Sequence, residues 1–153
     1  MTDRLQFHDV LPETYKRLLN LNSHVERMAE EHGVPRRLVE LVKIRCSQVN
    51  GCAFCTDLHV SQALEAGEEE RRLHLVATWR EAGGIFDAQE RAALALAEAV
   101  CHLPGTQEVP DDVYDAAAAV FGPDQLGVVV WAMAEIQVFN ALNVTSRKTL
   151  PER

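Results

Sequence analysis

Residues 35–66 of the chain read PRRLVELVKIRCSQVNGCAFCTDLHVSQALEA, and they contain two pieces of helix length joined by the dipeptide Asn50-Gly51. In the first piece apolar residues recur at helical spacing. The second piece, which carries two cysteines and a histidine, ends before the next glycine. An Asn-Gly dipeptide is a turn signal. The stretch therefore predicts a helix, a turn and a second helix.

Proline and glycine divide the rest of the sequence into pieces of the same kind. Asp87 and Glu90 match a capping box in front of an alanine-rich piece. Strand-like alternation and hairpin signals nowhere occur together. The other pieces predicted to be helical are residues 12–33, 68–82, 91–103, 110–122 and 123–144. We therefore predict an all-α fold of about seven helices, with residues 1–153 forming a single domain.

The last predicted helix is apolar almost all round. Its stretch from residue 128 to residue 139 contains three valines in succession, followed by a tryptophan, a methionine, an isoleucine and a phenylalanine. A helix without a polar face is buried centrally or shared with a second copy of the chain. We expect both, and hence a homo-oligomer.

The composition is that of an ordinary globular protein. Hydrophobic residues make up 47% of the chain and charged residues 25%, values that exclude a disordered acidic tail or a low-complexity linker. Fifteen Lys and Arg against 23 Asp and Glu give a formal charge of −8. An acidic surface without a basic cluster repels phosphate backbones, so we expect no nucleic-acid partner.

Hydropathy and the N-terminal sequence indicate the compartment. The longest strongly apolar run, around residues 128–134, is shorter than the roughly 18 residues of a membrane span. The N-terminus has no apolar signal core. We therefore expect no membrane association and a cytoplasmic location. Cytosolic reductants keep thiols reduced, so a Cys-x-x-Cys pair there is more often redox-active or metal-binding than a structural disulfide.

Cys52 and Cys55 are the first candidate site residues. Their i, i+3 spacing places the two side chains on neighbouring positions of one helix face, about 5–6 Å apart and close to disulfide geometry. The preceding turn puts both within the first helical turn, where free N–H groups and the helix dipole lower a thiol pKa. His59 lies four residues beyond Cys55 and shares the same face.

Glu40 joins this group if the two helices form a hairpin. It lies ten residues before Asn50, and His59 lies eight residues after Gly51. At about 1.5 Å per residue the two side chains stand at comparable heights above the turn. The carboxylate would then orient the imidazole and complete a carboxylate–histidine–thiol relay. A wide angle between the helices would separate them.

The remaining polar and sulfur-containing residues carry weaker signals. Cys46 and Cys101 have no partner at a useful spacing, so we interpret them as small buried hydrophobic residues. Ser47, seven residues after Glu40, could face the site. The spacing of Glu40, Cys52, Cys55 and His59 also supplies four possible zinc ligands, but cysteines on a regular helix converge poorly on one ion.

The pattern Glu-x11-Cys-x2-Cys-x3-His, filled by Glu40, Cys52, Cys55 and His59, resembles the alkylhydroperoxidase D-like branch of the carboxymuconolactone decarboxylase family. The likeness covers residues 35–103, and more loosely residues 109–147. It implies an all-helical fold that assembles into trimers or hexamers. In that family the second cysteine of the pair attacks the peroxide and the first resolves the sulfenic acid to a disulfide.

Carried onto this chain, the resemblance implies a cysteine-based peroxidase and disulfide reductase. Cys55 would attack, Cys52 would resolve, and His59 and Glu40 would relay the proton. From the residues alone the attacking sulfur is undecided, since Cys52 is nearer the helix end and Cys55 nearer His59. The substrates would be hydrogen peroxide or organic hydroperoxides, and the reductant a dithiol or a lipoyl protein. We expect no cofactor and no metal.

Three alternatives and one departure accompany this interpretation. A carboxymuconolactone-type decarboxylase would not need the adjacent thiols, a redox sensor would use the same thiols without turnover, and a zinc module would use them as ligands. The departure is Phe54, which stands where the best-known family member has a histidine before its second cysteine. This removes one proton carrier and bears on peroxidase efficiency more than on dithiol exchange.

Overall fold

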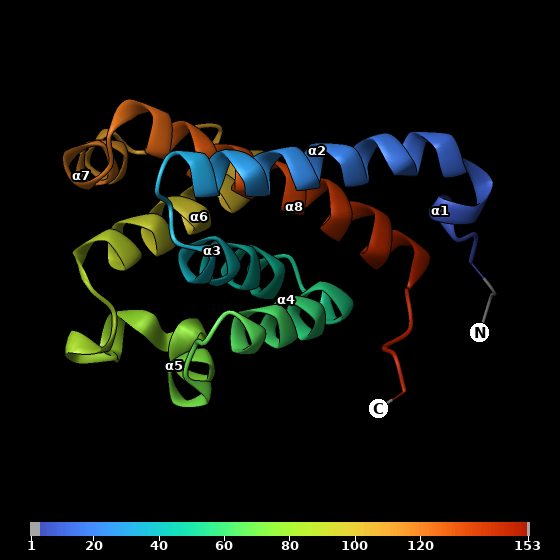
Figure 1. Cartoon of the computed structure of the whole chain (residues 1–153), viewed down its shortest axis with the longest axis horizontal. Coiled ribbons are helices and arrows are strands. Elements are labelled where there is room, and N and C mark those ends of the chain that lie inside the picture. Colours follow the sequence, from blue (N-terminus) through green and yellow to red (C-terminus); the bar gives the residue numbers. More distant parts are fainter. Residues whose placement is uncertain (1–3, 153) are drawn as a thin grey trace.

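The computed structural model describes residues 4–152, and all regular secondary structure in that range is helical (Figure 1). Its α-helices are α1 (Phe7–Val10), α2 (Pro12–Glu31), α3 (Arg36–Val49), α4 (Ala53–Glu65), α5 (Glu70–Leu75), α6 (Ala88–Thr106), α7 (Asp111–Val120) and α8 (Pro123–Ser146). Two short 3₁₀ segments, η1 (Val76–Glu81) and η2 (Gly83–Ile85), connect α5 to α6. The all-α prediction is confirmed, with eight α-helices in the described residues rather than about seven.

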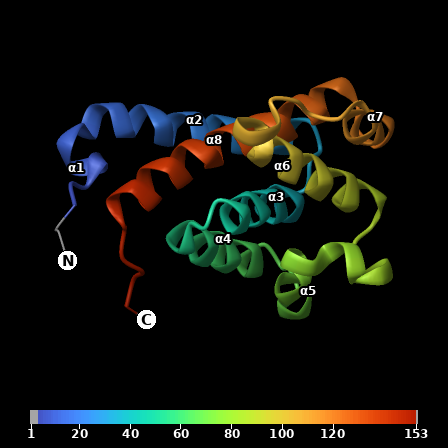
Figure 2. The same cartoon turned by 180° about the vertical axis from the view of Figure 1, so that it is seen from behind.

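Helix α3 lies at the centre of the bundle. The long helices α2 and α8 run side by side along one side of the molecule, α4 covers the opposite side, and α3 lies between them (Figures 1 and 2). Helix α6 also packs on α3. The chain turns sharply between α3 and α4, so the predicted hairpin is present.

The sequence of α3 explains its central place. One set of its side chains, which includes Leu38, Val42 and Cys46, belongs to a large apolar core shared with α2, α6 and α8. Leu41 and Ile44 point into a second core built with α5 and η1. Burial on both sides removes nearly all apolar surface of α3 from water, which is the main stabilising contribution to such a fold.

The region after α4 differs from the prediction. The piece expected as one helix over residues 68–82 is α5 followed by the 3₁₀ segment η1, because Thr78 leaves helical geometry at φ −119° and ψ 27°. This break lets the Trp79 side chain enter the second core, where it is buried. The guanidinium of Arg91 in turn bonds the Trp79 and Gly83 carbonyl oxygens.

Helix α6 also differs from its predicted bounds. The predicted capping box of Asp87 and Glu90 is present, with bonds of 2.9 and 2.8 Å. The helix continues past Pro104 to Thr106, three residues beyond the expected end at Leu103. The left-handed Gln107, at φ 61°, ends it by bonding the Leu103 carbonyl oxygen.

Helix α8 is long and apolar enough to cross a membrane by length and composition, which the shorter run noted in the sequence did not indicate. In the bundle it packs on α2, α3, α6 and α7, and it buries Glu135, Asn140 and Asn143. These polar residues and contacts are those of a core helix. Part of its surface stays open, since Trp131 is 57% exposed and Val138 46%.

Candidate active site

A tight turn fixes the two helices that carry the site. Gly51 has φ +68°, a left-handed conformation in which a side chain would be strained. Its N–H bonds the Gln48 carbonyl oxygen, and the next N–H, that of Cys52, bonds the Ser47 carbonyl oxygen at 2.9 Å. These bonds close the end of α3 and bring Cys52 to the first position before α4.

The two cysteines of the motif are in contact. Cys52 is the N-cap of α4, and its sulfur accepts a bond from the Cys55 backbone N–H at 3.4 Å. The thiol of Cys52 also lies 2.7 Å from the Cys55 sulfur and donates a hydrogen bond to it. Both side chains are 2% exposed. The two sulfurs therefore lie next to each other at the start of a helix, as predicted.

The contact makes the two thiols chemically different. The hydrogen bond from Cys52 lowers the pKa of Cys55 to about 6, against the opposing effect of burial, and a bond from Asn143 adds to the lowering. The same thiol–thiol bond, together with burial, raises the pKa of Cys52 well above its ordinary value. At neutral pH Cys55 is thus the thiolate and Cys52 holds the proton.

Two asparagines of α8 complete the surroundings of the sulfurs. Asn143 Nδ2 donates to the Cys55 sulfur at 3.2 Å. Asn140 Nδ2 donates to Ser47 Oγ at 3.0 Å, and its Oδ1 accepts from Asn50 at 3.0 Å. Neither residue was predicted from the sequence. The signal that could have found them is a pair of amides three residues apart on an otherwise apolar helix.

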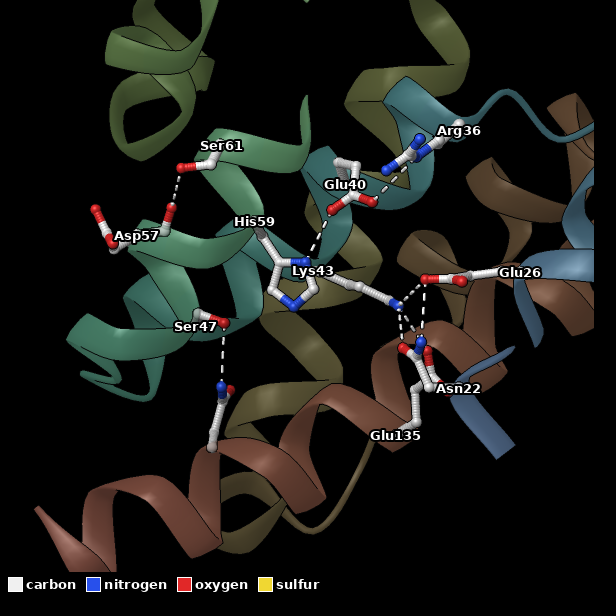
Figure 3. Close-up of polar contacts among 11 residues, drawn as sticks. Asn22, Glu26, Arg36, Glu40, Lys43, Ser47, Asp57, His59, Ser61 and Glu135 are labelled. Atoms are coloured by element: carbon white, nitrogen blue, oxygen red, sulfur yellow. Dashed lines mark hydrogen bonds and ion pairs between the residues drawn. The ribbon is translucent and has the colours of Figure 1, made fainter. Parts of the chain in front are cut away.

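Glu40 and His59 face each other across the hairpin. The Glu40 Oε2 and His59 Nδ1 atoms are 2.8 Å apart (Figure 3). Glu40 is 1% exposed and its other oxygen lies 3.8 Å from Arg36 Nε. A carboxylate accepts hydrogen bonds only, so Nδ1 carries the proton and Nε2 is the nitrogen left for proton exchange. The structure thus holds the four motif residues as two hydrogen-bonded pairs, and Cys55 and His59 line one cavity.

A buried ion pair lies beside this site. Lys43 Nζ is 2.8 Å from Glu135 Oε1 and 2.7 Å from Asn22 Oδ1, so it ties α3 to α8 and α2 (Figure 3). Both charged side chains are fully buried. Burial raises the pKa of Glu135, and the charge of Lys43 opposes this. The pair joins three helices beside the site, and His59 is close enough to lower the pKa of Glu135.

Two different hollows lie on the two sides of the thiol pair. Cys55 and His59 line a cavity of about 150 Å³, whose other walls include Leu19, Phe54, Leu58, Tyr15, Ile136 and Phe139. Cys52 lines a separate, open groove of about 540 Å³ with Gln48, Gly51, Ala53, Thr56, Asp57 and Val60. The cavity beside Cys55 is also lined by the amide side chains of Asn22, Gln62 and Asn143. The groove beside Cys52 is the more open of the two.

Three further residues were considered from the sequence, namely Ser47, Cys46 and Cys101. Ser47 is buried and faces the site through its bond to Asn140. Cys46 and Cys101 are buried, as predicted. Packing of α6 on α3 brings the Cys101 sulfur to 4.0 Å from the Cys46 carbonyl oxygen. Sequence spacing cannot reveal a contact between residues 55 positions apart.

The metal-ligand alternative gains no support from the geometry. Among residues 4–152, no group of three or more His, Cys, Asp or Glu side chains is arranged to hold a metal ion. The carboxylate of Glu40 is directed at the imidazole of His59, and the two cysteine sulfurs are directed at each other. The four side chains form two hydrogen-bonded pairs rather than one set of converging ligands.

Comparison with known proteins assigns the family. The model of the carboxymuconolactone decarboxylase family matches residues 12–99. The chain belongs to the carboxymuconolactone decarboxylase family. The uncharacterized protein YdfG of Bacillus subtilis (strain 168) is 31% identical over 144 residues, which are 94% of each chain.

A solved structure agrees with this assignment over the full length of both chains. It is the crystal structure of a protein of unknown function from Agrobacterium tumefaciens, named as a candidate antioxidant defence protein AhpD. The TM-score is 0.89 at 30% identity, and the match covers 99% of this chain and 100% of the other. Together with the family match, it confirms the identification as an alkylhydroperoxidase D-like member.

Proposed function

We propose that the chain is a thiol-dependent peroxidase that reduces hydroperoxides and is returned to its dithiol form by an external dithiol. The observation that carries the proposal is the polarised thiol pair, in which Cys52 donates to the thiolate of Cys55. A thiolate beside a cavity and a buried carboxylate–imidazole pair is the arrangement that attack on a peroxide needs. The antioxidant name of the structural neighbour supports the same reaction class.

The reaction proceeds in two steps. The Cys55 thiolate attacks one peroxide oxygen, the O–O bond breaks, and the leaving alkoxide takes a proton that His59 Nε2 has accepted from solvent. The sulfenic acid of Cys55 is then attacked by the Cys52 sulfur, which loses its proton, and water leaves as the disulfide forms. Glu40 holds the imidazole and stabilises its positive charge. Two electrons pass from the thiols to the peroxide.

The test of this function is turnover with substitutions at the motif. With hydroperoxide and dihydrolipoamide, Cys55→Ser should abolish peroxide consumption and Cys52→Ser should stop after one oxidation of Cys55. Glu40→Gln should lower the rate of the peroxide step by a factor of about 10²–10⁴, the usual contribution of a proton relay. Cys46→Ser and Cys101→Ser, also buried cysteines, are the controls and should retain most of the activity. Equal loss in all cysteine variants would indicate misfolding, and intact turnover of Cys55→Ser would contradict the proposal.

The cavity beside Cys55 favours organic hydroperoxides over hydrogen peroxide. Its apolar walls are supplied by Leu19, Phe54, Leu58, Ile136 and Phe139, and its small volume suits a short alkyl group. The cavity therefore binds the alkyl part and leaves the O–O bond at the sulfur. We expect a higher kcat/KM for tert-butyl hydroperoxide than for hydrogen peroxide. Leu58→Gln should reduce this ratio about tenfold, the effect of losing apolar contact in a pocket, and an unchanged ratio would contradict this assignment.

The open groove beside Cys52 is suited to the reductant. A thiolate attacks a disulfide at the sulfur whose partner leaves more easily, and Cys55 is the better leaving group because of its low pKa. Attack should therefore occur at Cys52, which lines the groove. Ala53→Trp, at an exposed position of this groove, should raise the KM for dihydrolipoamide. It should leave oxidation by peroxide in a single turnover unchanged, and loss of that step instead would contradict the assignment.

Decarboxylation is the alternative that the family name introduces. It does not use the thiol pair, so the Cys52→Ala/Cys55→Ala variant separates the two reactions. Decarboxylation of a muconolactone by that variant would support the alternative. A thiol sensor, in contrast, would be oxidised once and show no turnover with dithiol.

A further inference from the structure

The side chain of Asn22, on α2, joins a buried lysine to the cavity beside Cys55. Its Oδ1 accepts a hydrogen bond from Lys43 Nζ at 2.7 Å, and its Nδ2 donates to Glu26 Oε1 at 3.0 Å (Figure 3). The same side chain lines the cavity of about 150 Å³ that Cys55 and His59 also line. One wall of this cavity is therefore bonded directly to a buried ammonium group.

Lys43 fixes the direction in which the Asn22 amide faces. An ammonium group has three donors and no acceptor, so it bonds the amide oxygen and not the amide nitrogen. The nitrogen therefore faces away from the ammonium group, and it carries two hydrogens. One of them is donated to Glu26. The second has no protein acceptor among residues 4–152, so it is a donor that Asn22 can offer to a ligand in the cavity.

The buried ion pair polarises this amide. Lys43 and Glu135 are fully buried, and the Lys43 Nζ atom lies 2.8 Å from Glu135 Oε1. A buried ion pair adds little stability over apolar side chains of similar size, because both charges lose their hydration. The bond from the ammonium group to the amide oxygen is charge-assisted, and it makes the Asn22 N–H a stronger donor. The pair thus both orients the amide and strengthens it.

Asn22 stands on a different wall of the cavity from the reacting sulfur. Helix α4 carries Cys55 and His59, whereas α2 lies on the other side of α3 (Figures 1 and 2). When the sulfur attacks in line with the O–O bond, the leaving oxygen points away from the sulfur and toward the other walls. In a cavity this small, a ligand of a few heavy atoms contacts several walls at once.

We propose that Asn22 contacts the hydroperoxide in the peroxide step and that Lys43 is its positioning residue, an inference that rests on the proposed function. The Cys55 thiolate bonds to the terminal peroxide oxygen, the O–O bond breaks, and its electron pair passes to the leaving oxygen. The Asn22 N–H donates a hydrogen bond to that oxygen while its negative charge develops. The proton from His59 Nε2 then completes the alcohol or water. A donor already in place costs no reorganisation when the charge appears.

The other polar side chains of the cavity are less suited to this role. The Asn143 amide already donates to the Cys55 sulfur at 3.2 Å. Gln62 and Tyr15 line the same cavity, but within residues 4–152 no hydrogen bond holds either side chain. A side chain that is not held must lose rotamer freedom before it can donate. We therefore expect Gln62 to contribute less than Asn22.

The test compares two reactions of Cys55 in single turnover. One is its oxidation by tert-butyl hydroperoxide, and the other is its alkylation by iodoacetamide, whose leaving iodide needs no hydrogen-bond donor. Asn22→Leu keeps the approximate size of the side chain and removes the donor. The ratio of the oxidation to the alkylation rate constant should fall about 10²-fold, the effect of losing one such donor. Asn20→Leu, the same change at an exposed position of α2, is the matched control and should keep the ratio unchanged.

Two further variants test the same bond independently. Asn22→Asp keeps an oxygen facing Lys43 but has no N–H, so the ratio should fall in this variant too. Lys43→Met/Glu135→Leu removes the bond that positions the amide, and it should also lower the ratio. Adding Asn22→Leu to that double variant should then lower the ratio much less than it does in the unmodified chain, because the two residues act through one bond.

The outcomes separate this inference from the proposed function. An equal fall of both rate constants in Asn22→Leu would indicate a structural role and overturn the inference, and so would an unchanged ratio. A ratio in Gln62→Leu as low as that in Asn22→Leu would overturn it as well. In these cases oxidation of Cys55 in the unmodified chain leaves the proposed function intact. If the peroxide does not oxidise Cys55 in the unmodified chain, the proposed function fails and the inference fails with it.

Discussion

Cys55 becomes the thiolate because of its hydrogen bonds, and not because of its place on the helix. Cys52 stands at the helix start, where the dipole stabilises negative charge most. Yet the Cys52 thiol donates its proton in a hydrogen bond to the Cys55 sulfur. The same sulfur also accepts a hydrogen bond from Asn143. Two short-range donors at one sulfur outweigh a small difference in distance from the helix end, since charge-assisted hydrogen bonds are strong in a buried site.

The pH dependence of Cys55 reactivity follows from its pKa of about 6. Below this pH the thiol is protonated and its alkylation should slow about tenfold per pH unit, and above it the thiolate fraction and the rate should level off. An ordinary thiol would still be rising near pH 8.5. The measurement is the rate of iodoacetamide labelling at Cys55, followed by peptide mass spectrometry from pH 4 to 9.

Removal of the Asn143 amide should raise the pH midpoint of Cys55 labelling. Asn143→Ala removes a bond that favours the charged sulfur, so the midpoint should rise. Gln62→Ala, on another wall of the same cavity, is the matched control and should leave the midpoint near 6. A midpoint that stays unchanged in Asn143→Ala would contradict the role given to this bond.

Among the elements, α3 combines structural and chemical tasks. Its apolar side chains enter two cores, its residues Glu40 and Ser47 face the thiol site, and its end forms the turn to the cysteines. Lys43 lies on the same helix and is fully buried. A helix buried on all sides can hold such polar groups only if each finds a partner, because an unpaired buried charge is costly.

The ion pair of Lys43 with Glu135 should therefore be sensitive to removal of one partner. We expect Lys43→Met to lower the free energy of unfolding by about 3–5 kcal/mol, since it leaves the Glu135 carboxylate buried without a counter-charge. The measurement is the urea unfolding midpoint, monitored by circular dichroism.

The matched control is the double variant Lys43→Met/Glu135→Leu. It replaces both charges with apolar groups of similar size, so most of the lost stability should return. A double variant no more stable than Lys43→Met would show that the pair is not the cause of the loss.

At the scale of the whole molecule, an apolar surface remains on α8. Trp131 is 57% exposed, and Val138 and Val144 are 46% and 43% exposed on the same helix. Trp131 also lines a hollow of about 380 Å³ between α2 and α8. Large exposed aromatic and aliphatic side chains of this kind are typical of a surface covered by another chain. The homo-oligomer predicted from the sequence remains a prediction.

A charge at this surface should dissociate the assembly. We expect Trp131→Asp to lower the molar mass in solution, measured by light scattering after size exclusion, because a carboxylate is not readily buried in an apolar interface. Leu64→Asp, at an exposed position of α4, is the control and should keep the mass of the unmodified protein. A single-chain mass for the unmodified protein would contradict the prediction.

Most of the helices and the main residues of the site could be predicted from the sequence. Helical periodicity, the capping box at Asp87 and the Asn50-Gly51 turn depend on interactions within a few residues. The same holds for the spacing of Cys52, Cys55 and His59. These local rules were less reliable around Thr78, where burial of a tryptophan took precedence over helix continuation.

The other contacts of the site depend on packing between helices that are far apart in the sequence. Asn143 reaches the Cys55 sulfur from 88 residues away, and Cys101 meets Cys46 across 55 residues. No local pattern encodes such a contact, because it depends on how α6 and α8 lie on α3. Residue order thus specified the helices and the reactive pair. The choice of thiolate came from the folded bundle, since hydrogen bonds and burial act over a few ångströms in space whatever the separation along the chain.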